Sequence, residues 1–276
     1  MKKRRPIRAW LGEARPVDPA ELLGPRGLVN EVLTEADTES PADASAGELA
    51  DASEGTSEQA RQDAFHRSLM TDARLARIES VVAARLQSVT VVLDRLLDPH
   101  NIAAVLRTSE GLGLLAAHVI PNEDGDAGAH RRVTQDADKW LDVYAHRSGA
   151  EAATALKAQG YLVLAGHLTP DARLLSELPA DRPVALLFGN EHEGPSAQTL
   201  AACDGAFKIP MGGFTQSFNV SVAAAISLHS QVQARRRHLG AAGDLAEGQK
   251  QLLRSRYWKL GAKLARRVSG PPKQRS

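Results

Sequence analysis

The most informative stretch of this chain is GGFTQSFNVSVAAAI, which occupies residues 212–226. It follows a short apolar run that ends at Met211, and its two glycines let the backbone turn sharply or approach another group closely. Ser217 and Asn219 are residue types that cap helices, and the Ala-rich run after them indicates a buried helix. The stretch predicts a strand, a tight loop and a helix, with polar side chains where open sheets usually bind ligands. Taken alone, an ordinary strand-to-helix turn explains it equally well.

Working outward, short apolar runs alternate with helical patterns. The runs lie at residues 89–93, 117–120, 142–145, 162–165, 184–188 and 207–209, and the helical patterns lie at 101–112, 149–159, 196–202 and 219–237. Strands that are apolar on both faces and alternate with helices are typical of a parallel sheet covered by helices. The sequence therefore predicts an α/β fold.

Two further helical patterns flank this region. Leu75, Ile78 and Val82 form an apolar stripe in residues 66–88, and a second amphipathic pattern covers 253–268. We predict three parts: residues 1–63 as a disordered acidic extension, 64–240 as the α/β domain with a leading basic helix, and 241–276 as a basic C-terminal helical extension.

The charges of the chain are distributed unevenly, although the net charge is only +1. No Lys or Arg occurs between Arg26 and Arg61, where carboxylates repel one another, and no Asp or Glu follows Glu247. Such an acidic stretch buries too little apolar surface to offset its ordering entropy. The remaining, basic part suggests a polyanionic partner.

Composition also indicates the compartment. The single cysteine, Cys203, excludes an intramolecular disulfide and fits a reducing compartment. No apolar run reaches the roughly 18 residues of a membrane span, and the basic N-terminus lacks the apolar core of a secretory signal. We expect a cytoplasmic protein without a membrane partner.

One polar loop carries Asn101 at a helix start and Arg107 about two turns later. Arg107 stands beside apolar Val105 and Leu106, so we expect it to be partly buried and to need an anionic partner. That partner is either a local carboxylate in a structural ion pair or a phosphate of a ligand.

A second loop reads FGNEHEGPS at residues 188–196. Glu191, His192 and Glu193 are adjacent, so they do not easily converge on one ion, and we predict a pocket loop without metal. The glycines at 111 and 113 fit dinucleotide-binding spacing but follow a helix and precede a strand, which is the reverse of the required context. NAD and ATP are not supported.

Together the three loops resemble the SpoU branch of the SPOUT RNA methyltransferases. The first motif is Asn101-x-x-Ala104-x-x-Arg107-Thr108, the second is residues 187–194, and the third, the most specific, is residues 209–211 with 217–223. The resemblance covers about residues 66–240. It implies a deep trefoil knot, S-adenosylmethionine bound in a bent form, a homodimer paired through the knot with shared active sites, and a 2′-O-methylated ribose as product.

The resemblance also implies roles for single residues. Arg107 would be the catalytic arginine, supported by Asn101, Glu191, Ser217 and Asn219. The cofactor pocket would be lined by Gly166, Gly189, Ile209, Met211 and Phe218, where family members often have Leu at the last position. Family accounts make the arginine a general base, but a guanidinium keeps its proton in nearly all proteins. Arg107 therefore acts either as that base or as a clamp on an RNA phosphate.

A basic helix before the domain and a basic helix with Tyr257-Trp258-Lys259 after it resemble the TrmH branch of the family, as does Asp138-Lys139-Trp140. That branch methylates guanosine-18 in the D-loop of tRNA. Candidate tRNA contacts are Arg74, Arg77, Arg85, Lys139, Arg235 and Arg254. Two alternatives stay open, because no residue pattern reads a nucleotide directly. One is 2′-O-methylation of another tRNA or rRNA nucleotide, and the other is RNA binding without catalysis.

Overall fold

The apolar runs form one seven-stranded sheet in the computed structural model, which describes residues 58–121 and 139–268. The strands are β1 (Val89–Asp94), β2 (Ala116–Ile120), β3 (Asp142–Ala145), β4 (Leu162–Gly166), β5 (Arg173–Leu174), β6 (Val184–Phe188) and β7 (Gly205–Lys208). Their order is β3-β2-β1-β6-β4-β7-β5, and every pair is parallel. The predicted parallel α/β fold is confirmed.

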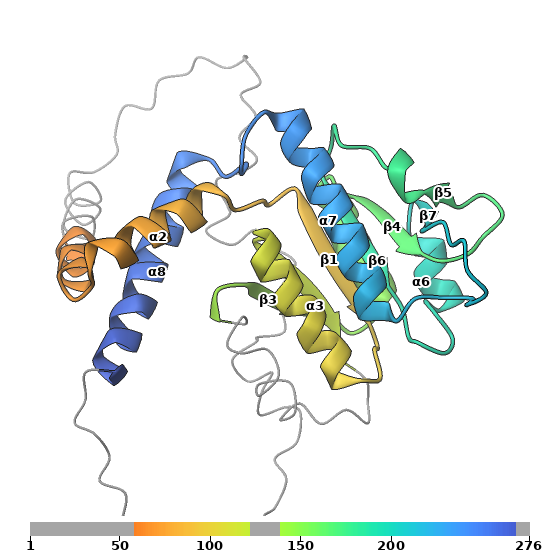
Figure 1. Cartoon of the computed structure of the whole chain (residues 1–276), viewed down its shortest axis with the longest axis horizontal. Helices are drawn as coiled ribbons and strands as arrows, with labels where there is room; N and C mark the ends of the chain where they lie inside the picture. Colours follow the sequence, from red (N-terminus) through yellow and green to blue (C-terminus); the bar gives the residue numbers. More distant parts are fainter. Residues whose placement is uncertain (1–57, 122–138, 269–276) are drawn as a thin grey trace, which may run out of the picture. The chain divides into compact units, whose positions relative to one another are not determined.

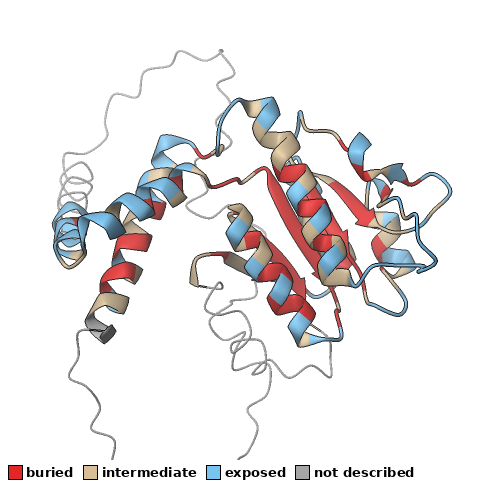
Figure 2. Ribbon diagram, viewed as in Figure 1, coloured by how far each residue is buried: buried red, intermediate tan, exposed pale blue. Residues whose placement is uncertain are grey.

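Helices cover both faces of the sheet (Figure 1). On one face, α3 (Pro99–Leu112) and α7 (Val220–Leu239) pack against each other and share a core with Val91, Leu93 and Leu186. On the other face, α5 (Gly149–Ala158) and α6 (Ala197–Ala202) pack on Val92 and Leu187. Neighbouring strand residues serve opposite cores because side chains alternate along a strand. Figure 2 shows the central strands buried throughout.

The described residues divide into two units, of which the first is Ala84–Leu245 with the sheet. The second contains a helical segment at 58–68, α2 (Asp72–Ala83) and α8 (Glu247–Val268). In this helical unit, Ile78 and Val82 of α2 and Leu253, Tyr257 and Ala262 of α8 are buried.

The boundaries expected near residues 63 and 240 stay predictions, since residues 1–57 lie outside the described part of the chain. Residues 58–63, which we had assigned to the acidic extension, belong to the helical segment. Within residues 58–121 and 139–268, no helix has both the length and the apolar composition needed to cross a membrane.

Capping explains where the helices differ from their predicted bounds. The pattern at 66–88 is two helices, because the Thr71 hydroxyl accepts a hydrogen bond from the Arg74 N–H and starts a new helix. The second of these ends at Ala83, and Leu86 instead bridges to Leu114. Helix α3 begins at Pro99, before Asn101, because the Asp98 carboxylate accepts from the His100 N–H.

Candidate functional site

The three motifs lie at one edge of the sheet. In a parallel sheet the carboxyl ends of all strands meet at the same edge, where open α/β sheets bind ligands. Strands β1, β6, β4 and β7 are neighbours in that order. The first motif follows β1, the second follows β6 and the third follows β7, so the topology brings together segments far apart in the sequence.

A chain of hydrogen bonds joins the three motifs through Asn101. Its side-chain Nδ2 donates to Oε1 of Glu191 at 2.9 Å. Its Oδ1 accepts from Nδ2 of Asn219 at 3.1 Å. Asn101 is buried, so an unpaired polar atom on its side chain would destabilise the fold. Both hydrogen bonds therefore contribute to stability. We call Asn101, Glu191 and Asn219 the amide cluster.

Backbone groups hold Glu191 in place. Its carboxylate accepts from the N–H groups of Leu97 at 2.9 Å and Asp98 at 3.4 Å, in the loop between β1 and α3. Partial burial raises the pKa of Glu191, but the hydrogen bonds from Leu97, Asn101 and Asp98 outweigh that effect, so the pKa lies below its ordinary value. Glu191 is therefore an ionised anchor for the first motif.

Asn219 has a second role as the N-cap of α7. Its Oδ1 accepts from the backbone N–H of Ser221 at 2.8 Å and of Val222 at 3.4 Å. The same oxygen also accepts from the Ser221 hydroxyl at 2.6 Å. One amide thus fixes the start of the helix and connects it to Asn101, so the position of α7 and the geometry of the cluster depend on each other.

The predicted cofactor glycines stand at the ends of two adjacent strands. Gly166 ends β4, opposite Phe207 of β7, and Gly189 follows β6. A Cβ atom at Gly189 would lie 2.1 Å from the backbone nitrogen of Pro195, so only glycine allows the chain to fold back there. Asn190 organises this turn, because its Oδ1 accepts from the N–H groups of His192 and Glu193.

The other predicted cofactor residues follow β7. Ile209 and Met211 are half-buried, whereas Phe218 is exposed. The structure thus places all five at the carboxyl edge of the sheet or in the loop that leads from it to α7.

Arg107 does not join the amide cluster of its own chain, and the expectation that it is partly buried is wrong. Helix α3 turns Ile102, Val105 and Leu106 inward, whereas Arg107 is exposed. Six residues of helix place its side chain about 120° around the axis from Asn101. Within the described residues, neither Arg107 nor exposed Ser217 makes a side-chain hydrogen bond.

Arg85 is not an RNA contact, because it is fully buried. Its guanidinium donates to Oε1 of Glu110 at 3.0 Å and to the carbonyls of Leu114 at 2.9 Å and Trp140 at 3.0 Å. The sequence placed Arg85 on a helix face, but the helix ends at Ala83 and the side chain turns into the domain. Arg85 is a structural residue.

The other five candidate RNA contacts occupy two places. Two of them lie toward the amino edge of the sheet, away from the amide cluster: Lys139, which precedes β3, and Arg235, near the end of α7. Arg235 donates to the Ser88 hydroxyl at 2.8 Å and the Ala180 carbonyl at 2.9 Å. Arg74 and Arg77 are exposed on α2, and Arg254 on α8 pairs with Glu79 at 2.8 Å and Glu247 at 2.6 Å.

Sequence reasoning missed the backbone donors of Leu97 and Asp98, because N–H groups leave no residue signature. It also missed Asn190. The Asn and Gly of the second motif were the available signal, since both residue types favour turns.

A model of the SpoU rRNA methylase family matches residues 88–229, which is more than half of the chain and includes all three motifs. The chain belongs to the SpoU methylase family. It is 42% identical over 171 residues to the tRNA (guanosine(18)-2′-O)-methyltransferase of Thermus thermophilus, covering 62% of this chain and 86% of that protein. It is 34% identical over 175 residues to the Escherichia coli protein of the same name, covering 62% and 74%.

A solved structure shows the same fold. The SpoU methylase fold of this chain matches the crystal structure of the A. aeolicus TrmH/SpoU tRNA modifying enzyme with a TM-score of 0.60 and 27% identity. The match covers 72% of this chain and 98% of the other. The resemblance drawn from the three motifs is thereby confirmed at the level of the family.

Proposed function

We propose that this protein transfers a methyl group from S-adenosylmethionine to the ribose 2′-hydroxyl of guanosine-18 in tRNA. The observation that carries the proposal is the amide cluster, which joins three family motifs at the ligand-binding edge of the sheet. Relatives that share these segments at 34–42% identity bear the name of this activity.

The cofactor region fits S-adenosylmethionine in its residue types. Gly189 lets the second motif fold back tightly at Pro195, and Gly166 lies against the rings of Phe188 and Phe207 at the end of the neighbouring strand. Ile209, Met211 and Phe218 offer apolar surface beside these glycines. Bound there, S-adenosylmethionine would supply its methyl group on an activated sulfonium.

The order of the strands supports a knotted chain. Strand β6 lies between β1 and β4, which both precede it in the sequence, and β7 then lies beyond β4. We infer that the segment from β6 to α7 threads through a loop of the chain and forms the deep trefoil knot of the family, one of the rare exceptions to unknotted folds.

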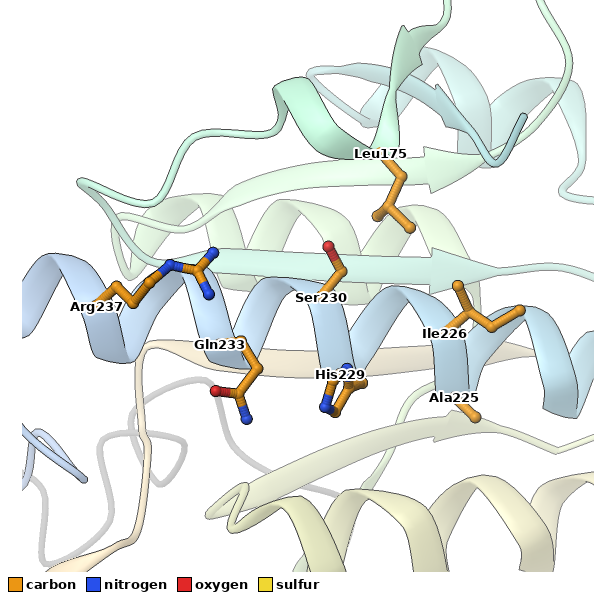
Figure 3. A pocket seen from close by; sticks show the side chains of 7 residues that line it. All are labelled: Leu175, Ala225, Ile226, His229, Ser230, Gln233 and Arg237. Carbon is orange, nitrogen blue, oxygen red and sulfur yellow. The ribbon is translucent and has the colours of Figure 1, made fainter.

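The position of Arg107 supports a homodimer with shared sites. Arg107 faces away from the cluster of its own chain, so a complete site needs the arginine of a second copy. The exposed face of α7 offers a docking surface, with Val222 45% and Ile226 37% exposed. Figure 3 shows the groove along this helix, which is lined by Leu175, Ala225, Ile226, His229, Ser230, Gln233 and Arg237. We propose that a second copy packs there and supplies its Arg107 to the amide cluster.

In this arrangement Arg107 clamps an RNA phosphate. Its guanidinium stays protonated, so positioning is the better role for it than proton abstraction, and the proton of the 2′-hydroxyl would pass to water as the oxygen–methyl bond forms and the sulfur–methyl bond breaks. Correct placement of reactants can supply about 7–11 kcal/mol of a barrier, whereas general-base help is worth about 10²–10⁴ in rate. The amide cluster would hold the first and third motifs at the distance that this alignment requires.

Mapping of methylated riboses tests the proposal. Purified protein is incubated with S-adenosylmethionine and a tRNA transcript, and nuclease fragments are analysed by mass spectrometry. We expect one 2′-O-methylguanosine at position 18, and none with the Arg107→Ala variant. A transcript with 2′-deoxyguanosine at position 18 serves as the control, because it lacks the acceptor. Methylation of another tRNA or rRNA nucleotide would refute the target, and no methylated ribose in either RNA would refute catalysis.

A further inference from the structure

Residues 27–57 form a strongly acidic run that the proposed reaction does not use. The run contains eight Asp and Glu residues and no Lys or Arg. It lies outside the described residues, so only its sequence enters the argument. We call it the acidic arm.

The opposite charge is concentrated in the helical unit. Residues 58–83 and 246–268 together contain eleven Lys and Arg against five Asp and Glu, a net charge of +6. Residues 84–245 contain fourteen against seventeen, a net charge of −3. The basic character expected for the whole folded part therefore belongs to the helical unit, and the SpoU methylase domain itself is slightly acidic.

Several cations of the helical unit are available to an anion. Arg77 of α2 and Lys259 and Lys263 of α8 are exposed, and none of the three forms an ion pair within the described residues. Lys259 and Lys263 are four residues apart, so they lie on the same face of α8. Arg254, in contrast, is already paired with Glu79 and Glu247.

The acidic arm is followed by a segment that is held against α8. It leads directly into the helical segment at 58–68, whose Asp63 accepts a hydrogen bond from the Ser255 hydroxyl of α8 at 2.5 Å. Arg67 of the same segment lies over the Trp258 ring, 5.2 Å from its centroid. The helical segment that follows the arm is thus held against α8 at Ser255 and Trp258, within about one helical turn of Lys259.

The acidic arm is long enough to contact the cations of α2 and α8. Its 31 residues span at most about 110 Å when fully extended, compared with a length of about 33 Å for α8. Covalent attachment gives short tethers effective concentrations in the millimolar range. The arm carries a net charge of −8 and the helical unit one of +6, so they attract each other. Salt weakens this attraction, since the screening length is about 10 Å at 0.1 M, and contact is therefore favoured at low salt.

We propose that the acidic arm binds the exposed cations of α2 and α8 and competes with RNA for them. The proposal rests on the proposed function in one respect, namely that the helical unit contacts RNA. An RNA held by phosphate contacts alone must displace the arm without further gain. Both kinds of RNA pay the same cost, so the ratio of their affinities is unchanged. The weaker, non-specific RNA then falls below saturation, whereas a tRNA that also fills the amide-cluster site keeps enough affinity to stay bound.

A charge-neutral arm in the full-length protein tests the competition. The eight carboxylates are replaced by the matching amides (Glu→Gln, Asp→Asn), and binding of an 18-nucleotide single-stranded oligonucleotide is measured between 50 and 300 mM salt. We expect about tenfold tighter binding at the lowest salt. The salt dependence should steepen by about 2 in log–log slope, because the three freed cations each add about 0.7. Unchanged affinity and slope would overturn the proposal.

A shuffled arm of unchanged composition is the matched control and should bind RNA like the natural chain. A second comparison separates contact from long-range repulsion. The neutral arm is combined with Lys259→Glu and Lys263→Glu, or with Arg173→Glu and Arg182→Glu, two exposed cations of the first unit. The gain from neutralising the arm should vanish in the first background and persist in the second. An equal gain in both would overturn the proposal.

These assays measure binding and not methyl transfer, so the two proposals fail separately. If the protein methylates guanosine-18 but its RNA affinity does not depend on the charge of the arm, only the proposed competition is refuted. If the RNA affinity depends on the charge of the arm but the protein methylates no ribose, only the proposed function is refuted.

Discussion

Asn101 shows at the scale of one residue how distant motifs form a site. A side-chain amide is a donor and an acceptor at once, and Asn101 uses both, toward Glu191 and Asn219. A carboxylate or an aliphatic side chain of similar size cannot make both bonds. The spacing of the motifs indicated this role only through the family resemblance, since residues 101, 191 and 219 are far apart in the chain.

The lowered pKa of Glu191 predicts a pH-dependent contribution to stability. Because the folded pKa lies below the ordinary value of 4.5, the contribution is complete above that pH and is lost as pH falls through the folded pKa. Glu191→Gln should therefore lower the free energy of unfolding at pH 7, and its difference from the natural protein should shrink in acid. Denaturant titrations between pH 3 and pH 7 measure this.

Exposed Glu193 offers the matched control for Glu191. None of its side-chain atoms makes a hydrogen bond within the described residues, so Glu193→Gln should differ little from the natural protein at any pH. A stability gap for Glu191→Gln that stayed constant across the pH range would contradict the assignment of Glu191 as an ionised anchor.

Arg85 and Arg77 should respond oppositely to substitution, although both were candidate RNA contacts. Removing one partner of a buried ion pair costs about 3–5 kcal/mol, so Arg85→Ala should destabilise the fold strongly. Arg77→Ala removes an exposed side chain and should change stability by less than about 0.5 kcal/mol while weakening RNA binding. Thermal unfolding and RNA titration of both variants measure this. Equal stability losses would contradict the assignment.

At the scale of elements, the N-cap of α7 couples folding to the site. Asn219→Asp keeps a capping oxygen but leaves the buried Oδ1 of Asn101 without its donor, so we expect a stability loss of about 1–3 kcal/mol and a methyl-transfer rate lower by about 10²-fold. Asn219→Ala should lose that activity and, with the cap, about 1 kcal/mol more of stability. Unfolding and single-turnover assays separate the two effects.

Ser148 provides a control cap away from the site, because its hydroxyl accepts from the Glu151 N–H at the start of α5. Ser148→Ala should lose a similar stability without losing activity. If Asn219→Asp retained full activity, the bond to Asn101 would have no role in catalysis.

The strands and most helices were predictable because their apolar runs are short and periodic. Strand β6 was predicted with its observed bounds, and β3 as well. The two residues of β5 were missed, since Arg173 and Leu174 form no apolar run. The order of the strands in the sheet was not predictable, because the local sequence of β6 carries no signal that it pairs with β1. The exposure of Arg107 was misjudged because its neighbours in sequence are apolar, whereas helix geometry turns them inward and Arg107 outward.

At the scale of the whole molecule, the candidate site and the excess of positive charge belong to different units of the chain. The SpoU methylase domain holds the amide cluster and the predicted cofactor glycines, and the helical unit holds the excess of basic residues. Sequence composition alone suggested a uniformly basic folded part, because the division into units is a property of packing. Within the sheet unit, Arg107 is exposed and makes no side-chain hydrogen bond to the amide cluster of its own chain.

Mixed dimers test the shared site most directly. Arg107→Ala and Asn219→Asp chains carrying different affinity tags are co-expressed, and the mixed dimer is isolated by sequential purification. One of its two sites then combines an intact Arg107 with an intact amide cluster from the other chain. We predict that the mixed dimer methylates guanosine-18 at about half the natural rate per dimer, while each homodimer is nearly inactive. A mixed dimer as inactive as both homodimers would contradict the account.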